Sequence, residues 1–461
     1  MEIFKIIKLL KGLFTRAAQE TAIPKHTPNV IPRAEHCISR EHINPHALKV
    51  LYRLHQAGFM ACLVGGCVRD LLLGRQPKDF DVATDARPEE VRRLFKNCRL
   101  IGRRFRLAHI IFGHEIIEVA TFRTHHDGGE LEHGKSRDDG MIIRDNVFGN
   151  IEDDVWRRDF TVNALYYNIA DFSVIDYTSG MDDIAAKQLR IIGDPDKRFV
   201  EDPVRLLRAV RLAGKLHFTI HTQTEHVISR HSHLLEHVSP ARLFQETLKL
   251  FHEGATIRAF HLLQKYHLLN SLFSQTAACL DQPQTKQLVE QALSGTDQRV
   301  QEDKKVSSSF VLSALLWRPI LQHASHAEHD GLPPYPALEK GLKTVIEKQL
   351  KQLAIPRRIT IAIREIVILQ HHFQQRRGNR PWRTLEHPRF RAAYDLLLLR
   401  AESGENIKEL ADWWTQFQAA DHPTRESLLR EINHNKRPVR RRRPQARRHK
   451  NLPVNKTTLE K

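Results

Sequence analysis

The sequence predicts an α+β head, with a small mixed or antiparallel sheet and helices, followed by a mostly α-helical neck and body. Between about residues 36 and 180 the apolar positions switch between strand and helix periods, as they do in α+β domains. From about residue 181 the period becomes almost wholly helical. Since 461 residues exceed the usual size of one domain, two or three packed units are expected.

The composition favours a polyanionic partner. Lysine and arginine outnumber aspartate and glutamate by 72 to 54, and the net charge of +18 suits either nucleic acid or an anionic membrane surface. No run of about 18 apolar residues exists, which argues against a transmembrane helix. The cysteines are odd in number and never form a CxxC pair, so we expect reduced thiols in a cytoplasmic protein, without a disulfide framework or zinc site; they are Cys37, Cys62, Cys67, Cys98 and Cys279.

The first 35 residues are expected to precede the head. Over residues 1–17, apolar side chains gather mostly on one side of a helical projection and basic side chains on the other, which is typical of a basic amphipathic helix. A docking or partly disordered extension is favoured, and peripheral contact with a membrane surface is the alternative. Residues 18–35, with three prolines, have the composition of a linker.

The remaining chain is divided by its periodicity. We expect the head over residues 36–180, a helical neck over 181–250, a helical body over 251–432 and a basic tail over 433–461. The segments with the most regular helical spacing are Ala241–Phe251, Ser309–Trp317, Arg357–His371 and Phe390–Arg400.

The tail holds eleven basic residues and one acidic residue, a net charge of +10. Over half of the chain's net charge therefore lies in a segment that is unable to form a core, and the tail is expected to be disordered. Its candidate RNA contacts are Arg440, Arg441, Arg442, Arg443, Arg447 and Arg448.

A glycine pair stands at a predicted strand-to-helix turn. The apolar stretch Ala61–Val64 predicts a short strand that runs into Gly65 and Gly66. The segment Val68–Leu73, which contains Arg69, then predicts a helix. Glycines at such a turn let backbone N–H groups approach phosphate oxygens, and the helix N-terminus adds partial positive charge. Alone, the pattern is more typical of a plain tight turn.

Two aspartates follow this turn. A strand would place Asp79 and Asp81 on one face, with Phe80 and Val82 on the other. Like charges held so close are costly unless cations lie between them, and carboxylate oxygens suit Mg²⁺ that bridges the phosphates of a nucleotide. With two Mg²⁺ ions, one would activate an attacking 3′ hydroxyl and the other would stabilise a pyrophosphate leaving group. An isolated D-x-D is common on protein surfaces, so the preceding glycine turn favours the catalytic interpretation.

A third carboxylate of the metal site has two candidates. The predicted strand Ile116–Arg123 carries Glu118, and Asp159 follows the arginine pair Arg157 and Arg158. The sequence leaves the choice open. The arginines are suited to gripping a triphosphate, because guanidinium is a fixed bidentate donor to phosphate oxygens. Their alternative is a surface ion pair with a nearby aspartate.

Four motifs occur in a fixed order along the first half of the chain: Leu63–Asp70 (LVGGCVRD), Asp79–Asp81 (DFD), Arg157–Thr161 (RRDFT) and Glu201–Arg205 (EDPVR). In this order they resemble the class II tRNA nucleotidyltransferase and bacterial poly(A) polymerase family over about residues 45–250. The resemblance implies that the glycine turn and the arginines of these motifs hold a triphosphate. It also implies that the aspartates hold Mg²⁺ and that the EDxxR helix reads the incoming base.

The EDxxR motif has a chemistry that suits base recognition. Asp202 is a favourable N-cap and Pro203 a favourable first helical residue, which would set Asp202 and Arg205 side by side. One acceptor beside one donor complements an exocyclic amine next to a ring nitrogen, as on adenine and cytosine. The pair alone does not separate A from C, and an ordinary ion pair at a helix start is the alternative. Arg208 continues the basic side of this helix and is a candidate contact for RNA.

Three features favour poly(A) synthesis over CCA addition. The segment Ile101–His109 resembles the arginine-rich element of bacterial poly(A) polymerases, which makes Arg103, Arg104 and Arg106 candidates for adenine selectivity or RNA binding. The segment Phe390–Leu397 resembles their C-terminal body. A basic tail suits RNA of no fixed sequence, because phosphate contacts position without specifying.

The expected function is therefore transfer of AMP from ATP to RNA 3′ ends, with RNA turnover as the expected consequence. A CCA-adding tRNA nucleotidyltransferase is the close alternative, and a non-catalytic RNA-binding protein is the distant one. The expected partners are RNA 3′ ends, ATP and RNA-decay proteins. The histidines of His125-His126-Asp127 lie in a polar, glycine-rich stretch, which predicts a mobile loop rather than a metal phosphohydrolase site.

Overall fold

The computed structural model describes residues 27–102, 106–124, 135–136, 142–144 and 147–434. Its contacts divide the chain after Ile363 into two compact units. The amphipathic helix predicted over residues 1–17, the histidine loop at 125–127 and all the candidate arginines of the tail lie outside the described residues. Within the described ranges, no helix is both long and apolar enough to cross a membrane.

An eight-stranded sheet forms the head, with strand order β1-β10-β9-β2-β3-β6-β5-β4. Strands β3 and β6 pair in parallel, and all other neighbours in this sheet are antiparallel. The predicted α+β class with a mixed sheet is therefore confirmed. The strands are β1 Asn29–Ile31, β2 Ala61–Val64, β3 Asp81–Thr84, β4 Cys98–Ile101, β5 Leu107–Phe112, β6 Glu115–Thr121, β9 Leu165–Asn168 and β10 Val174–Asp176, with a separate pair β7 Lys135–Ser136 and β8 Ile142–Arg144.

The linker predicted over residues 18–35 is wrong at its C-terminal end. Strand β1 lies inside that stretch and pairs with β10, with Val30 opposite Ile175, and a short helix, η1 (Arg33–Glu35), follows. The flanking Pro28 and Pro32 stand outside the three paired residues. An edge strand accommodates prolines at its ends, so their presence did not exclude a β-strand.

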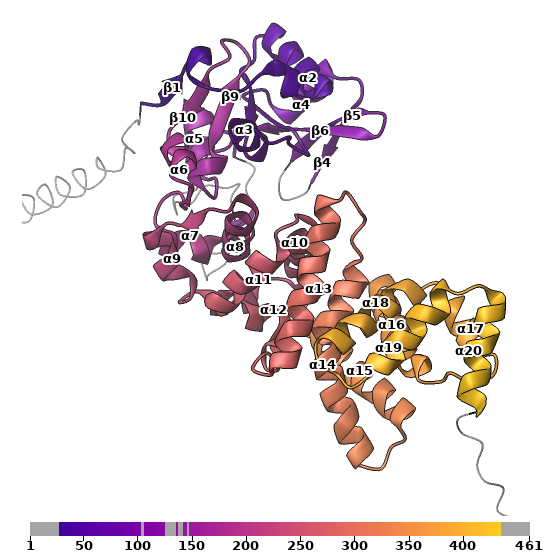
Figure 1. Ribbon diagram of the computed structural model, residues 1–461. Coiled ribbons are helices and arrows are strands. Elements are labelled where there is room, and N and C mark those ends of the chain that lie inside the picture. The colour runs from indigo at the N-terminus through magenta and orange to yellow at the C-terminus, as the bar shows by residue number, and fades with distance from the viewer. Residues whose placement is uncertain (1–26, 103–105, 125–134, 137–141, 145–146, 435–461) are drawn as a thin grey trace, which may run out of the picture. The chain divides into compact units, whose positions relative to one another are not determined.

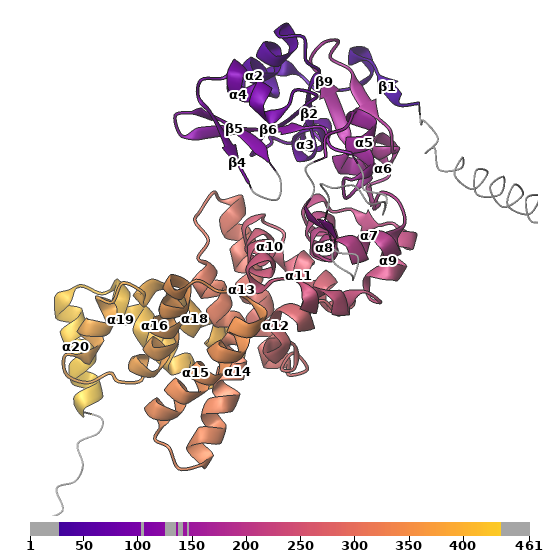
Figure 2. The ribbon, with the colours of Figure 1, turned by 180° about the vertical axis from the view of Figure 1, so that it is seen from behind.

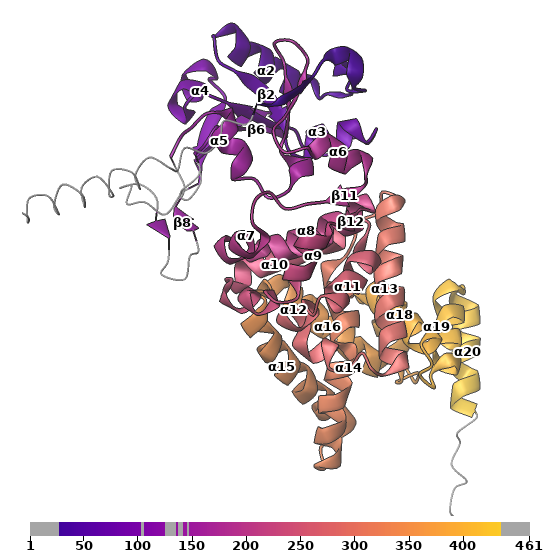
Figure 3. The same cartoon turned by 90° about the vertical axis from the view of Figure 1, so that its left-hand side faces the viewer.

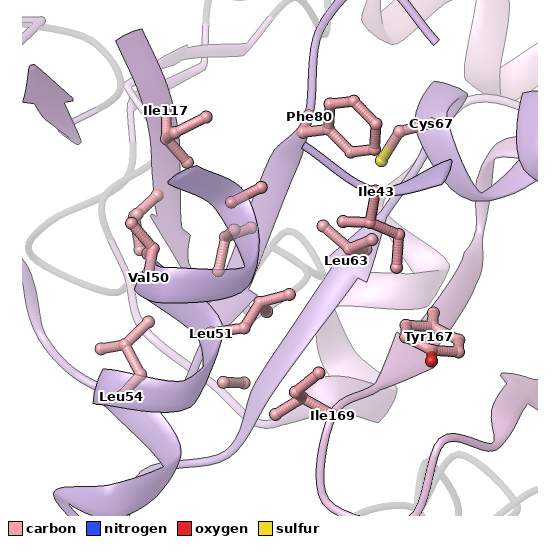
Figure 4. Close-up of a cluster of buried hydrophobic side chains, with 14 of the residues drawn as sticks. Ile43, Val50, Leu51, Leu54, Leu63, Cys67, Phe80, Ile117, Tyr167 and Ile169 are labelled. Carbon is pink, nitrogen blue, oxygen red and sulfur yellow. The ribbon is translucent and has the colours of Figure 1, made fainter. Parts of the chain in front are cut away.

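Helices α2 (Pro45–Gln56) and α4 (Pro88–Leu94) cover one face of the sheet (Figure 1). The apolar face of α2 follows helical spacing, and Val50, Leu51 and Leu54 belong to the same buried cluster as Leu63 of β2 (Figure 4). Each such fully buried side chain contributes about 1.5–3 kcal/mol of hydrophobic stabilisation. This core fixes the sheet whose opposite face carries the polar residues of the site.

Short helices connect the strands. Helix α3 (Gly66–Leu72) follows β2 directly, as the glycine turn predicts, and its buried residues join the same core as α2. Helix α5 (Ile151–Trp156) instead packs through Val155 against Tyr166 of β9, in the second core cluster. The remaining short elements of the head are η2 Arg40–His42, η3 Thr161–Asn163 and α6 Gly180–Ala185.

The rest of the first unit is helical except for one parallel pair of short strands, β11 (Gln188–Leu189) and β12 (Thr219–Ile220). Helices α10, α11 and α13 pack together (Figure 2), and α14 and α15 form a long hairpin (Figure 3). These helices are α7 Pro195–Glu201, α8 Val204–Leu216, α9 Thr222–Ile228, η4 Ser232–His237, α10 Pro240–His252, α11 Thr256–Lys265, α12 Leu269–Ala277, α13 Pro283–Gln301, α14 Ser308–His329 and α15 Pro334–Gln352.

Helix α16 (Arg357–Phe373) leads into the second unit, which continues with α17 Arg380–Leu385, α18 Phe390–Glu402, α19 Lys408–Ala419 and α20 His422–His434. Its core is aromatic: the rings of Phe373 and Trp414 lie 4.9 Å apart edge to face, and Trp414 Nε1 donates to the Phe373 carbonyl at 2.9 Å. The four segments with the most regular helical spacing all lie in helices, namely α10, α14, α16 and α18. The predicted change to helical structure in the second half is therefore confirmed.

Candidate active site

Three carboxylates gather on the face of the sheet opposite α2 and α4. Asp81 begins β3 and stands in parallel register with Glu118 of β6, so the two side chains leave the same face. Asp79 precedes the strand and is exposed like Asp81, whereas Phe80 between them is buried. Although part of the Asp81 side chain reaches solvent, the surrounding protein desolvates its carboxylate and raises its pKa to about 6, with Glu118 and Asp79 adding to the rise and Arg158 opposing it. The structure therefore brings together Asp79, Asp81 and Glu118.

The carboxylates of Asp79, Asp81 and Glu118 fit a divalent cation that is also bound by phosphate groups of a substrate. Carboxylate oxygens are hard ligands, and a cation would relieve the repulsion that raises the pKa of Asp81. In the part of the chain that the structure describes, no group of three or more His, Cys, Asp or Glu side chains could hold a metal ion unaided. Mg²⁺ is commonly held by one or two carboxylates together with substrate phosphates, and Asp79 and Asp81 match that pattern.

Asp159, the competing third carboxylate, is engaged elsewhere. It is 9% exposed, and its Oδ2 lies 2.5 Å from the guanidinium of Arg208 on α8. Its Oδ1 accepts from the backbone N–H of Phe160 at 2.8 Å and from Asn163 at 3.3 Å. Burial disfavours the charged form, yet Arg208 and these hydrogen bonds lower the pKa of Asp159 to about 2. The structure thus places Glu118 beside Asp81 and ties Asp159 to the neck.

The glycine turn lies against Arg158. Gly65 has φ +81°, which favours glycine, and a Cβ on it would lie 3.7 Å from Arg158 Nη1. The Arg158 Nε and Nη2 atoms donate to Asp154 at 3.0 and 2.7 Å, and Nε also donates to Tyr166 Oη at 2.7 Å. The ion pair with an aspartate is therefore present, but it is buried rather than on the surface, and it fixes the guanidinium beside the turn.

Arg198 of α7 binds the backbone of the turn that carries Arg157 and Arg158, here called the arginine turn. Its Nη2 donates to the carbonyls of Arg157 at 2.8 Å and Arg158 at 2.6 Å, and its Nη1 donates to Glu201 at 2.6 Å. Arg205 Nη1 donates in turn to the Arg198 carbonyl at 2.7 Å and to Glu201 at 3.0 Å. Burial and the neighbouring Arg205 lower the pKa of Arg198 to about 10. The triphosphate and base candidates are thereby linked through one hydrogen-bonded network.

The predicted N-cap role of Asp202 is wrong, and the ion pair with Arg205 that was the alternative to base recognition does not form. Asp202 ends α7 and Pro203 is the N-cap of α8, so Asp202 does not cap the helix. Its Oδ2 accepts from Arg242 of α10 at 2.7 Å, and Arg205 is held by Glu201 instead. The two side chains are therefore oriented by different partners. The Oδ1 atom of Asp202 is left buried without a hydrogen-bond partner.

Two cavities contain most of the candidate residues. The first, of about 460 Å³, is within the range of small-molecule sites and combines arginines from the head and the neck. The second, of about 690 Å³, contains the three gathered carboxylates. The first is lined by Leu107, Ala120, Arg123, Asp154, Arg157, Arg158, Asp159, Asp202, Arg205, Arg208 and Arg242.

Some expected site residues lie apart from these cavities or outside the described residues. Arg69 is buried, with 3% of its surface exposed. Its Nε and Nη2 donate to Asp70 at 2.9 and 2.7 Å, and its Nη1 donates to Asn163 at 2.5 Å. Arg69 therefore stabilises the helix that follows the glycine turn. Arg106 is exposed and pairs with Glu89 at 2.7 Å. Arg103 and Arg104 lie outside the described residues.

Several residues of the site carry no signal in the sequence. Arg242 meets Asp202 across 40 residues of chain, and Lys249, which lines the second cavity, comes from the same helix α10. Their positions depend on how α10 packs against α8, which no local pattern reveals. Asp154 could be recognised as a partner of Arg158 only because it is an acid one helical turn earlier. Tyr166, the other partner, has no such signal, since it lies in a strand.

Three family descriptions match segments of the chain. "Poly A polymerase head domain" matches residues 61–190, "Probable RNA and SrmB- binding site of polymerase A" matches 217–280, and "Polymerase A arginine-rich C-terminus" matches 330–449. The first of these contains the three carboxylates and the arginine turn.

Whole-length similarity is to proteins named Poly(A) polymerase I. The protein of that name from Escherichia coli O6:H1 is 48% identical over 450 residues, which are 95% of this chain and 96% of the relative. A CCA-adding enzyme from Bacillus subtilis is 38% identical over 226 residues, 49% of this chain and 55% of its own length. A solved structure described as a tRNA-processing enzyme in an apo form superimposes with a TM-score of 0.56 at 23% identity, over 86% of this chain and 98% of the other, and therefore shares the fold.

Proposed function

The chain belongs to the bacterial poly(A) polymerase I family, and from this we propose that it transfers AMP from ATP to RNA 3′ ends and releases pyrophosphate. The observation that carries the proposal is an arginine-lined cavity beside three gathered carboxylates: Ala120 of β6 lines the first cavity, and Glu118, two residues earlier on the same strand, lines the second. Such a site can bind a polyphosphate substrate at the arginines and hold an attacking hydroxyl at the carboxylates.

In the proposed complex, ATP occupies the first cavity. The guanidinium groups of Arg157 and Arg158 and the backbone N–H groups of the glycine turn bind the triphosphate. The unpartnered Oδ1 of Asp202 accepts a hydrogen bond from the exocyclic amine of adenine, and Arg205 donates to the adjacent ring nitrogen. The Arg242 and Glu201 contacts hold these two groups in place before the nucleotide arrives.

The reaction forms a bond between the RNA 3′ oxygen and the α-phosphorus of ATP and breaks the bond from that phosphorus to the bridging oxygen of pyrophosphate. Asp79, Asp81 and Glu118 lie where the attacking hydroxyl loses its proton. Mg²⁺ held by Asp79 and Asp81 would supply activation of that hydroxyl and neutralisation of the leaving group. Arg158 lies close enough to lower the pKa of Asp81, so its charge also reaches the transferring phosphoryl group.

A CCA-adding activity is the rival, and an acceptor assay separates the two. The purified protein is given a tRNA that lacks its terminal CCA, together with ATP and CTP. We expect long AMP tracts with few or no CMP additions. The similarity to the CCA-adding enzyme covers 49% of this chain, so CCA addition is the rival activity to exclude. A product that stops after CCA would contradict the proposal.

The basic tail is proposed to bind RNA phosphates. Deleting residues 433–461 is expected to weaken RNA binding and to flatten the plot of log affinity against log salt by about 0.7 for each lost phosphate contact. ATP binding should be little changed. A full-length variant with Arg440, Arg441, Arg442 and Arg443 replaced by glutamine keeps the length and removes the charge. An unaltered salt slope in both variants would show that the tail does not bind RNA.

A further inference from the structure

The two cavities lie next to each other on one face of the sheet. Strands β5 and β6 pair antiparallel with Ala108 opposite Val119 and His109 opposite Glu118, a register that sets Leu107 opposite Ala120. Residues two apart on a strand share a face, so the Leu107–Ala120 and His109–Glu118 pairs stand side by side. The former pair lines the first cavity and the latter pair lines the second cavity. Two molecules, one bound in each cavity, would therefore lie next to each other near Glu118.

The second cavity has the lining expected for a nucleic-acid strand end. Besides the carboxylates it contains two lysines, Lys78 beside Asp79 and Lys249 from the neck helix α10. Ile116, which is 50% exposed despite its size, supplies apolar surface for a sugar or base. A lysine ammonium binds phosphate as a point charge and reads no base, unlike the paired groups of Asp202 and Arg205.

Lys249, which lines this cavity, is oriented by an ion pair within its own helix, α10. Its ammonium lies 2.8 Å from Glu246 Oε1, which is one turn earlier on α10 and 9% exposed at its side chain, whereas the lysine side chain is 50% exposed. A half-exposed ammonium beside a buried carboxylate has donors left for a further anion, because lysine has three.

We propose that Lys249 and Lys78 position the acceptor RNA by contacting its last phosphodiester, beside the carboxylates at which its 3′ hydroxyl reacts. This inference rests on the proposed AMP transfer. Each addition creates a new 3′ end that must re-enter the same position, and a contact with phosphate alone accepts every end equally. The neck helix α10 thereby serves both substrates: Arg242 orients the nucleotide-reading Asp202, and Lys249 positions the acceptor.

The test is the kinetics of Lys249→Met, which keeps the aliphatic stem and removes the charge. We expect the KM for an RNA oligomer to rise about fivefold, as for the loss of one solvent-exposed ion contact, with kcat and the KM for ATP within about twofold of the wild type. RNA binding without ATP, followed by fluorescence anisotropy, should show a salt slope lower by about 0.7. Lys249→Arg should restore both values.

Lys286→Met is the matched control. Lys286 is 55% exposed and also pairs with a glutamate of its own helix, Glu290, but it lies on α13 outside the lining of both cavities. Its loss should leave the KM for RNA unchanged. The inference is overturned if the wild type adds AMP and Lys249→Met has an unchanged KM for RNA, or if the KM for ATP rises equally. A wild-type protein that adds no AMP would instead overturn the proposed function.

Discussion

Replacing Asp79 or Asp81 by alanine is expected to lower the rate of AMP addition by at least about 10³-fold, because each loss removes charge stabilisation from the transferring phosphoryl group. Both side chains are exposed, so the fold should remain. The rate is measured as single-turnover extension of a labelled RNA oligomer, and the thermal unfolding midpoint is followed by circular dichroism. Asp182→Ala, an exposed acid of the head on α6, is the control and should be neutral.

Two further variants separate the candidates for the third carboxylate. Glu118→Gln should lower the rate by about 10²-fold at an unchanged unfolding midpoint, because Glu118 faces Asp81. Asp159→Asn should lower the unfolding midpoint and raise the KM for ATP, because it removes the partner of Arg208 in the nucleotide cavity. The assignment fails if Asp159→Asn removes chemistry without loss of stability while Glu118→Gln is neutral.

Replacing Asp202 by alanine is expected to cost about 1–3 kcal/mol in discrimination for ATP. The variant removes the buried Oδ1 that is proposed to accept from the exocyclic amine, and it also releases Arg242. Selectivity against GTP and UTP should relax first, since adenine and cytosine share the polarity that this oxygen reads. Exclusion of CTP is proposed to depend on the segment Arg103–His109 by its resemblance to poly(A) polymerases.

The measurement is kcat/KM for each of the four nucleotides with one RNA oligomer. Asp196→Ala is the matched control, because Asp196 lies on the same helix α7 and pairs with His231 away from the first cavity. Unchanged ratios among the four nucleotides in Asp202→Ala would remove Asp202 from base recognition.

Local patterns predicted much of this architecture. The glycine turn, the aspartates that follow it and the long amphipathic helices depend on residues close together in the chain, and all appear where the periodicity indicates. The short edge strand β1 was missed because it has only three residues between prolines and is formed by pairing with β10, more than a hundred residues later. Its pairing partner, not its own sequence, makes it a strand.

Long-range partners position the residues between which the sequence left a choice. The choice between Glu118 and Asp159 depends on the register of β3 against β6, which sets Glu118 opposite Asp81. The expected side-by-side placement of Asp202 and Arg205 followed from their spacing, but Arg242 on another helix binds the Asp202 carboxylate. Spacing along one helix predicts which side chains are neighbours, whereas tertiary packing decides which of them bond.

The most direct test of AMP transfer is incubation of the purified protein and Mg²⁺ with an unstructured RNA oligomer and each nucleoside triphosphate separately, with products resolved by length. We expect a ladder of many additions with ATP, few or none with CTP, GTP or UTP, and none when Asp81→Ala replaces the wild type. Absence of extension with ATP, or equal extension with all four nucleotides, would contradict an adenylyl-specific polymerase.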